Sequence, residues 1–227
     1  DLAEALRHAH QQGLYHRALA PQHVSVVVRE GRPRIKIQDW HTAARTTTTT
    51  ATSMAAATQH ILEHVSEPTH LYLAPETLRI PDPQPGPADI WSLGAIAFLI
   101  LSGHPPAKDL DGLHEVLRNQ GHLSLASVMD APARELDEIV RTATKVDATD
   151  RLVSVEEFLG FLGWALEELT APEEADPLNA NQGDTIDGTW SVVRRIGTGG
   201  TSVVLLVEGK ERQEVLKVAR DEEHGQR

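Results

Sequence analysis

The stretch "DIWSLGAIAFLILSG", residues 89–103, is apolar around nearly the whole circumference of a helix. A helix without a polar face is stable in a folded protein only where other elements surround it. The run is interrupted by Ser92, and it is shorter than the ~20 residues that a membrane-spanning helix needs. We therefore predict a helix at the centre of a protein core, and no membrane segment in this part of the chain.

Helical periodicity continues on both sides of this segment. Residues 1–12 carry apolar side chains at the spacing of one helix face. Residues 133–145 and 154–169 are predicted to be amphipathic helices, and Ser154 with Glu157 has the pattern of a capping box at the start of the second. The part of the chain up to residue 169 is therefore predicted to be mostly helical.

Two short strands and a low-complexity stretch lie between the first predicted helix and the buried one. Residues 24–28 and 34–38 are predicted to be strands around a turn at residues 30–31. Consecutive threonines follow at positions 46–50, and small residues continue to about Thr58. Such a stretch buries little apolar surface, so we predict an exposed loop.

The character of the chain changes after the last predicted helix. Residues 170–187, "TAPEEADPLNANQGDTID", are acidic and rich in turn formers, which predicts a linker. Residues 188–227 have β-type composition, with strand-like runs around a glycine-rich turn and a further strand at 214–218. We predict an α+β chain with a mostly helical domain at 1–169, this linker, and an antiparallel β fragment at 188–227.

The composition limits the chemistry that the chain can perform. Its 227 residues carry a net charge of −12, with 33 acidic against 21 basic side chains. General nucleic-acid binding is excluded, because it needs clustered lysine and arginine. The absence of cysteine excludes disulfides, thiolate catalysis and cysteine-based zinc sites. These properties fit a cytoplasmic protein, and we expect the sequence, which does not begin with Met, to be part of a longer one.

Short motifs along the chain follow the order that they have in protein kinases, and on these motifs the chain resembles that family. "HRALAPQHV", residues 16–24, resembles the catalytic loop H-R-D-x-K-P-x-N, and "DWH", residues 39–41, holds the place of D-F-G. "YLAPE", residues 72–76, matches the A-P-E motif, and "DIWSLG", residues 89–94, resembles the start of the central helix of the large lobe. Arg151 stands where that lobe carries an arginine paired with the A-P-E glutamate.

The resemblance implies that the chemistry of the first domain has been lost. Ala18 and Ala20 occupy the positions of the family's catalytic Asp and Lys, and His23 that of the metal-binding Asn. Alanine neither accepts a proton nor carries charge, and imidazole is a poor ligand for magnesium. Asp39 remains a candidate magnesium ligand. We therefore predict a pseudokinase.

The other motif residues of the first domain are expected to hold its shape. Asp89 is expected to cap loop amides, and Glu76 and Arg151 are expected to form a buried ion pair. The full set of predicted structural residues is His16, Arg17, Pro21, Glu76, Asp89 and Arg151.

A second group of motifs lies after the linker. "IGTGGTSVV", residues 196–204, resembles the glycine-rich loop of kinases, whose glycines let the backbone approach phosphates closely. "EVLKVA" follows, with Lys217 at the position of the lysine that pairs with the α- and β-phosphates. Its apolar neighbours argue against an exposed strand lysine. The predicted ATP-binding residues are Ile196, Gly197, Gly199, Gly200, Ser202, Val204 and Lys217, with ATP and Mg²⁺ bound by the complete second domain.

The glycine-rich motif follows the catalytic loop, which is the reverse of the order in one kinase domain. A circular permutation would leave no residues for the rest of the small lobe, so we predict tandem kinase domains. The resemblance is to bacterial Hanks-type serine/threonine kinases. It implies a scaffolding or regulatory first domain, an ATP-binding second domain, and a protein substrate or regulatory partner. A wholly non-catalytic tandem scaffold and residual phosphotransfer by the first lobe stay open as alternatives.

Two further signals are interpreted as weaker. "HILEH", residues 60–64, fits the zinc-hydrolase pattern H-x-x-E-H, but short matches arise by chance and no third ligand is indicated. The threonines at 46–50 fall where kinases keep their activation segment, so a phosphate there could pair with Arg17. We favour a plain low-complexity loop over that regulatory role.

Overall fold

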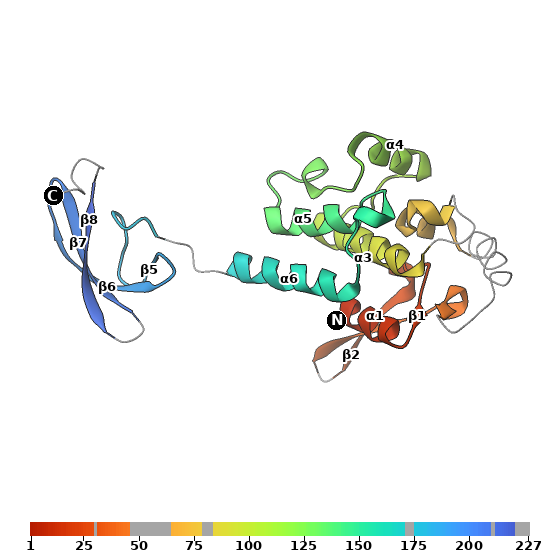
Figure 1. The fold of residues 1–227 in the computed structure, drawn as a ribbon, viewed down its shortest axis with the longest axis horizontal. Helices are drawn as coiled ribbons and strands as arrows, with labels where there is room; N and C mark the ends of the chain where they lie inside the picture. The colour runs from red at the N-terminus through yellow and green to blue at the C-terminus, as the bar shows by residue number, and fades with distance from the viewer. Residues whose placement is uncertain (30, 46–64, 79–83, 171–174, 210–211, 221–227) are drawn as a thin grey trace. The chain divides into compact units, whose positions relative to one another are not determined.

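The structure is a computed structural model that describes residues 1–29, 31–45, 65–78, 84–170, 175–209 and 212–220. The threonine run and the "HILEH" motif lie outside these residues. The chain divides into two units, Asp1–Leu169 and Thr170–Arg227, and each is described by itself (Figure 1). Together they mix helices with antiparallel sheets, as the predicted α+β class requires.

Helices make up most of the first unit. Those expected at residues 1–12, 89–103, 133–145 and 154–169 are confirmed, with small differences at their ends. Ser154 Oγ accepts a hydrogen bond from Glu157 N at 3.2 Å, so half of the predicted capping box forms. The helices are α1 (Leu2–Gln11), α3 (Pro85–Ser102), α4 (Leu110–Gln120), α5 (Arg134–Ala143) and α6 (Val155–Thr170).

Helix α3 is the centre of the first unit. Ile90 and Trp91 on it have no exposed surface, and Phe98 is 2% exposed. The helix ends at Gly103, whose φ of 74° places it in the left-handed region that closes helices. Within the described residues α3 is also long and apolar enough to cross a membrane, but 56% of it is buried inside the fold. Its apolar composition is therefore accounted for by its place in the core.

Helix α4 was not predicted from the sequence. Its apolar face is narrow, because Leu113 and Leu117 are its buried side chains. Its ends carry clear signals nevertheless. Asp109 caps the first turn by accepting a hydrogen bond from Gly112 N at 2.8 Å, and Gly121 closes the last turn with a φ of 74°.

Short strands and 3₁₀ turns connect the helices. Strand β1 (Leu14–Tyr15) pairs antiparallel with β4 (Ala44–Arg45), and β2 (Val24–Arg29) pairs antiparallel with β3 (Arg32–Ile37), as the predicted hairpin requires. The 3₁₀ turns are η1 (Pro21–His23), η2 (Trp40–Thr42), η3 (Glu67–Tyr72), η4 (Pro75–Leu78), η5 (Leu125–Ser127) and η6 (Ala148–Asp150).

The second unit is an antiparallel sheet in the order β5-β6-β7-β8. Its strands are β5 (Thr185–Ile186), β6 (Trp190–Thr198), β7 (Ser202–Glu208) and β8 (Gln213–Ala219). Along β7 the side chains alternate, so that Val203, Leu205 and Val207 are buried on one face. This is the two-residue period of a strand with one covered face.

Residues 175–187 carry more structure than the predicted linker. Ala175 N donates to Thr185 O at 3.0 Å, and Ala180 and Ile186 pack into the core of the second unit. Acidic residues close the turns, because Asp176 accepts a hydrogen bond from a backbone amide two residues later. Their composition predicted an exposed linker, whereas their few apolar side chains cover the sheet.

Gly94 allows α3 and α5 to pack closely, and this gives a prediction. A Cβ atom at Gly94 would lie 2.7 Å from Ala143 Cβ and 2.8 Å from Thr144 Cγ2. We expect Gly94→Ala to lower the free energy of unfolding by about 1–3 kcal/mol, the usual cost of overpacking a core. Urea unfolding followed by far-ultraviolet circular dichroism measures this change.

Gly160 provides the matched control, because it also lies inside a helix but has no atom within 4 Å of an added Cβ. We expect Gly160→Ala to be neutral or to stabilise by up to about 1 kcal/mol, since alanine is the better helix former. Equal effects of the two substitutions would contradict the role of close packing at Gly94.

Candidate functional site

The loop at residues 16–24 is held by the carboxylate of Asp89 on α3. His16 N donates to Asp89 Oδ2 at 2.8 Å, and Arg17 N donates to Asp89 Oδ1 at 2.7 Å. The ring of His10 on α1 approaches the same carboxylate, with Nε2 at 2.9 Å from Oδ2. Asp89 has no exposed surface. Three donors thus surround a buried acceptor, which is the condition for keeping a charge inside a core.

Arg17 has a left-handed backbone conformation, with a φ of 68°. Such a conformation in a non-glycine residue costs on the order of 1 kcal/mol or more, and it persists where surrounding contacts enforce it. Asp89 provides one of these contacts, and Thr42 Oγ1 provides another by donating to His16 O at 3.0 Å. The loop is therefore held from both sides.

His16 fills the space between the loop and the "DWH" residues. Its ring has no exposed surface. The centre of the ring lies 4.8 Å from the centre of the Trp40 ring and 5.6 Å from that of the His23 ring. Its Nε2 lies 2.8 Å from Gln38 O, so this nitrogen carries the proton and donates. Burial lowers the pKa of His16, because desolvation disfavours the charged ring; the carbonyl of Gln38 and the charge of Asp89 oppose this shift.

Ala18 and Ala20, the predicted replacements of two catalytic side chains, are both buried. Ala18 is 1% exposed and Ala20 has no exposed surface. Ala18 packs against Leu73, with Val65 beside them. Leu73 belongs to the "YLAPE" motif, and Val65 lies in the segment before it. Apolar side chains therefore occupy the space above Ala18.

His23 and Asp39 face each other at the predicted metal position. His23 Nε2 lies 3.7 Å from Asp39 Oδ2, while His23 Nδ1 lies 2.8 Å from Ala18 O. Pro21 begins the turn that places His23 here. Within the described residues, no group of three metal-ligating side chains occurs. Magnesium prefers oxygen ligands, so an imidazole beside a single carboxylate does not fit a magnesium site.

Glu76 and Arg151 form a bidentate ion pair. Arg151 Nη1 donates to Glu76 Oε1 at 2.5 Å, and Nη2 donates to Oε2 at 2.7 Å. The guanidinium also donates to the carbonyls of Lys145, Val146 and Pro87, and it lies 5.1 Å from the centre of the Trp91 ring. Because Arg151 is 4% exposed, these contacts replace the water that its charge has lost.

The predicted phosphate-binding residues of the second unit lie around one hairpin of its sheet. Gly197 pairs with Val204, and Val204 pairs with Lys217, so these three residues form one row across β6, β7 and β8. Gly199 N donates to Ser202 O at 2.8 Å and closes the turn. Ile196 lies at a register shift of β6 and is 46% exposed, and Gly200 lies in the turn itself with free space around its Cα.

Lys217 is exposed, contrary to the argument from its apolar neighbours. Adjacent side chains of a strand point to opposite faces, so Leu216 and Val218 leave the face of Lys217 open. The row of Gly197, Val204 and Lys217 therefore lies on the face opposite the buried Val203 and Leu205.

Sequence reasoning missed several contributors to the first site. His10 reaches Asp89, and Leu73 covers Ala18, although each lies far along the chain from its contact. For His10 the available signal was a polar side chain in the last turn of a helix that ends just before the loop. For Leu73 no pattern in the sequence identified the contact.

The sequence of the chain is similar to those of known proteins. The protein kinase domain family matches residues 1–165. A probable kinase, PglW of Streptomyces coelicolor, is 32% identical over 266 residues of alignment, which cover 100% of this chain and 17% of the relative. CBL-interacting protein kinase 4 of Oryza sativa subsp. japonica is 28% identical over 181 residues, covering 78% of this chain and 36% of the relative. The chain thus spans well under half the length of these relatives.

The lowered pKa of His16 predicts a dependence of stability on pH. Above its ordinary value of 6.5 the ring is neutral in the folded and unfolded states. As the pH falls below 6.5, the unfolded chain takes up a proton that the folded chain does not. The free energy of unfolding should therefore decrease until the pH reaches the lowered pKa of the folded state.

Urea unfolding at a series of pH values between neutral and acid measures this loss. His16→Gln keeps a donor for Gln38 O but cannot titrate, so its stability should fall less steeply with acid than that of the native chain. Parallel stability curves for the two proteins would rule out His16 as the source.

Proposed function

The chain belongs to the protein kinase family, and we propose that its first unit is a degenerate large lobe with a scaffolding or regulatory role. In this proposal the lobe is fused to a kinase domain that binds ATP and phosphorylates serine or threonine residues of proteins. The similarity to a probable bacterial kinase along the whole chain supports the arrangement. Its partner would be a protein, either a substrate or a regulator, in the cytoplasm.

The covered position of Ala18 is the observation that carries this proposal. A kinase places a base where the substrate hydroxyl arrives, so that the base accepts the hydroxyl proton during transfer. The methyl group of Ala18 accepts no proton, and Ala18 packs in one apolar cluster with Leu73 and Val65. Ala18 is 1% exposed, which leaves a substrate no access to it.

The charges of the site support the same conclusion. Phosphoryl transfer concentrates negative charge on the transferred group, which a lysine and metal ions normally neutralise. Ala20 offers no charge, and His23 instead of an oxygen ligand faces Asp39. Acid–base assistance alone contributes about 10²–10⁴-fold to a rate. The loss of several groups together therefore predicts a negligible rate of phosphoryl transfer.

The lobe keeps the contacts that maintain its shape. Asp89 still binds the loop amides, and Arg151 still binds Glu76. A catalytic loop with intact supports and without reactive groups is suited to presenting a surface. This combination favours a scaffolding or regulatory role over residual phosphotransfer.

The second unit supports ATP binding. The glycine-rich hairpin lets backbone amides approach phosphates, and Lys217 supplies a positive charge in the same row of the sheet. Bound ATP would supply the phosphoryl group that the complete domain transfers, and Mg²⁺ would neutralise charge on the phosphates. This row of Gly197, Val204 and Lys217 favours a nucleotide-binding second domain over a scaffold without any nucleotide site.

The first prediction from this proposal concerns phosphate transfer by the chain. We expect the 227-residue chain to transfer no phosphate from radiolabelled ATP to itself or to myelin basic protein, with either magnesium or manganese present. The reason is that the loop at residues 16–24 has alanine at positions 18 and 20. The amount of label in the heat-denatured chain sets the background.

Asp39→Asn provides the comparison for this assay, because it removes the remaining carboxylate at the metal position. Steady incorporation of label that Asp39→Asn abolishes would overturn the assignment of the first lobe as degenerate. Incorporation that survives this substitution points to a contaminating kinase and is removed by further purification before the assay is scored.

The second prediction concerns the nucleotide. In the full-length protein, Lys217→Ala should weaken ATP binding by about 10-fold to 100-fold, the effect of one charge-assisted contact of about 1.5–3 kcal/mol. Arg212→Ala is the matched control, since Arg212 pairs with Glu214 and lies outside the glycine-rich hairpin. Titration with a fluorescent ATP analogue measures the affinity of each variant. Equal affinities of the two variants would contradict the assignment of Lys217.

A further inference from the structure

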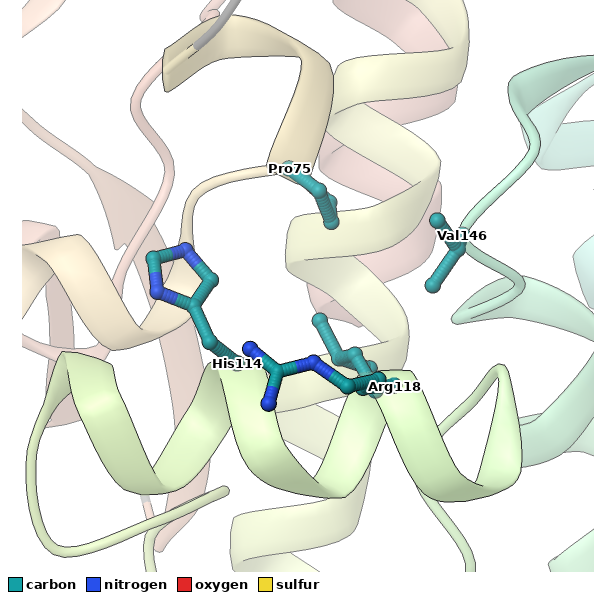
Figure 2. Close-up of a pocket in the computed structure, with 5 residues that line it drawn as sticks. Pro75, His114, Arg118 and Val146 are labelled. Atoms are coloured by element: carbon teal, nitrogen blue, oxygen red, sulfur yellow. The ribbon is translucent and has the colours of Figure 1, made fainter.

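A pocket of about 330 Å³ lies in the first unit, apart from the degenerate loop. Figure 2 shows its walls, which come from α4, from the "YLAPE" motif and from the segment that follows α5. The residues that line it are Pro75, His114, Leu117, Arg118 and Val146. None of them has been assigned a role in the chemistry or in the nucleotide site.

The floor of the pocket is apolar. Pro75 is buried, Leu117 is 7% exposed, and Val146 is partly buried. A pocket of this volume with these walls admits one aliphatic or aromatic side chain of a ligand. Removing such a side chain from water stabilises a complex in proportion to the apolar area that it buries.

The rim of the pocket carries the guanidinium of Arg118 and the imidazole of His114. His114 and Arg118 lie one turn apart on α4, on the same side of the helix (Figure 2). Arg118 is exposed, and neither side chain forms an ion pair with another residue that the structure describes. The chain as a whole carries a net charge of −12, so the positive charge of Arg118 is opposite in sign to the total charge of the chain.

The walls of the pocket are fixed before any ligand binds. Pro75 precedes Glu76, which Arg151 holds, and the same arginine donates to Val146 O at 3.1 Å. Val146 N donates to Gly121 O at 2.9 Å and thereby fixes the end of α4. One buried network thus positions every wall, so binding orders few residues and loses little free energy in doing so.

We propose that this pocket binds an acidic segment of a partner protein. An apolar side chain of the segment inserts between Pro75, Leu117 and Val146, and a neighbouring aspartate or glutamate faces Arg118 and His114. The exposed guanidinium of Arg118, which forms no ion pair with another described residue, supplies the attraction for an acidic side chain at this rim. The inference goes beyond the proposed function, because it holds whether or not the first lobe transfers phosphate.

A peptide rather than a nucleic acid or a membrane fits this geometry. Nucleic acids require several phosphate contacts from clustered cations, and the rim offers one arginine and one histidine. A membrane surface needs an exposed apolar or basic face, whereas the apolar surface here lies at the floor of a pocket.

Selection from a random peptide library displayed on phage tests the proposal. The bait is the immobilised 227-residue chain, and the enriched peptides are then synthesised and titrated by fluorescence anisotropy. We expect them to carry a large apolar residue with aspartate or glutamate within two positions of it. A selection that enriches nothing, or that enriches peptides without this pairing, overturns the proposal.

Substitutions on α4 locate the binding. Arg118→Glu should weaken the enriched peptides about tenfold, because it replaces an attraction with a repulsion, and Arg118→Met should weaken them by less. Arg134→Glu on α5 makes the same charge change at an exposed arginine outside the pocket, and it should leave binding unchanged. Circular dichroism checks that all three variants are folded.

A charge exchange completes the test. Peptides in which lysine replaces the acidic residue should bind Arg118→Glu more tightly than they bind the native chain. If Arg118→Glu binds the acidic peptides as tightly as the native chain does, the pocket is not their site and the proposal fails. If lysine peptides prefer the native chain, the assigned charge complementarity is wrong.

Discussion

The first unit depends on one buried carboxylate. Asp89 lies on the central helix α3, has no exposed surface, and accepts hydrogen bonds from the backbone amides of His16 and Arg17. A charge in a core is tolerated only where donors surround it, so the carboxylate and the loop require each other. The left-handed conformation of Arg17 and the burial of Ala18 both follow from this attachment. The carboxylate therefore fixes the shape of the loop, in which alanine stands at positions 18 and 20.

A second buried charge connects parts of the lobe that are distant in sequence. Arg151 holds Glu76, contacts the ring of Trp91, and donates to the carbonyl of Val146. These contacts join the "YLAPE" motif to the segment that follows α5. The same network forms the walls of a pocket whose rim carries Arg118. The contacts that hold the motif in place therefore also shape the proposed binding pocket.

A large part of the fold could be predicted from sequence, because it rests on local patterns. The positions of α1, α5 and α6 followed from the period of apolar residues, and that of α3 from its apolar composition on all sides. The paired strands β2 and β3 followed from a turn between two strand-like runs. Helix α4 was not predicted, because its two buried leucines form only a narrow apolar stripe. The packing of residues 175–187 was not predicted, because their composition is mainly acidic and only a few apolar side chains cover the sheet. In both cases the folded chain buries side chains that the local sequence pattern does not mark as buried.

The sequence by itself determined that positions 18 and 20 carry no ionisable side chain, since alanine has none in any fold. It also determined family membership, because motif order is a property of the chain. Only the tertiary structure decided that Leu73 covers Ala18, that His23 faces Asp39, and that Arg118 borders an apolar pocket. The physical reason is that residue type and spacing act locally. Contacts between distant positions arise only when the whole core has packed.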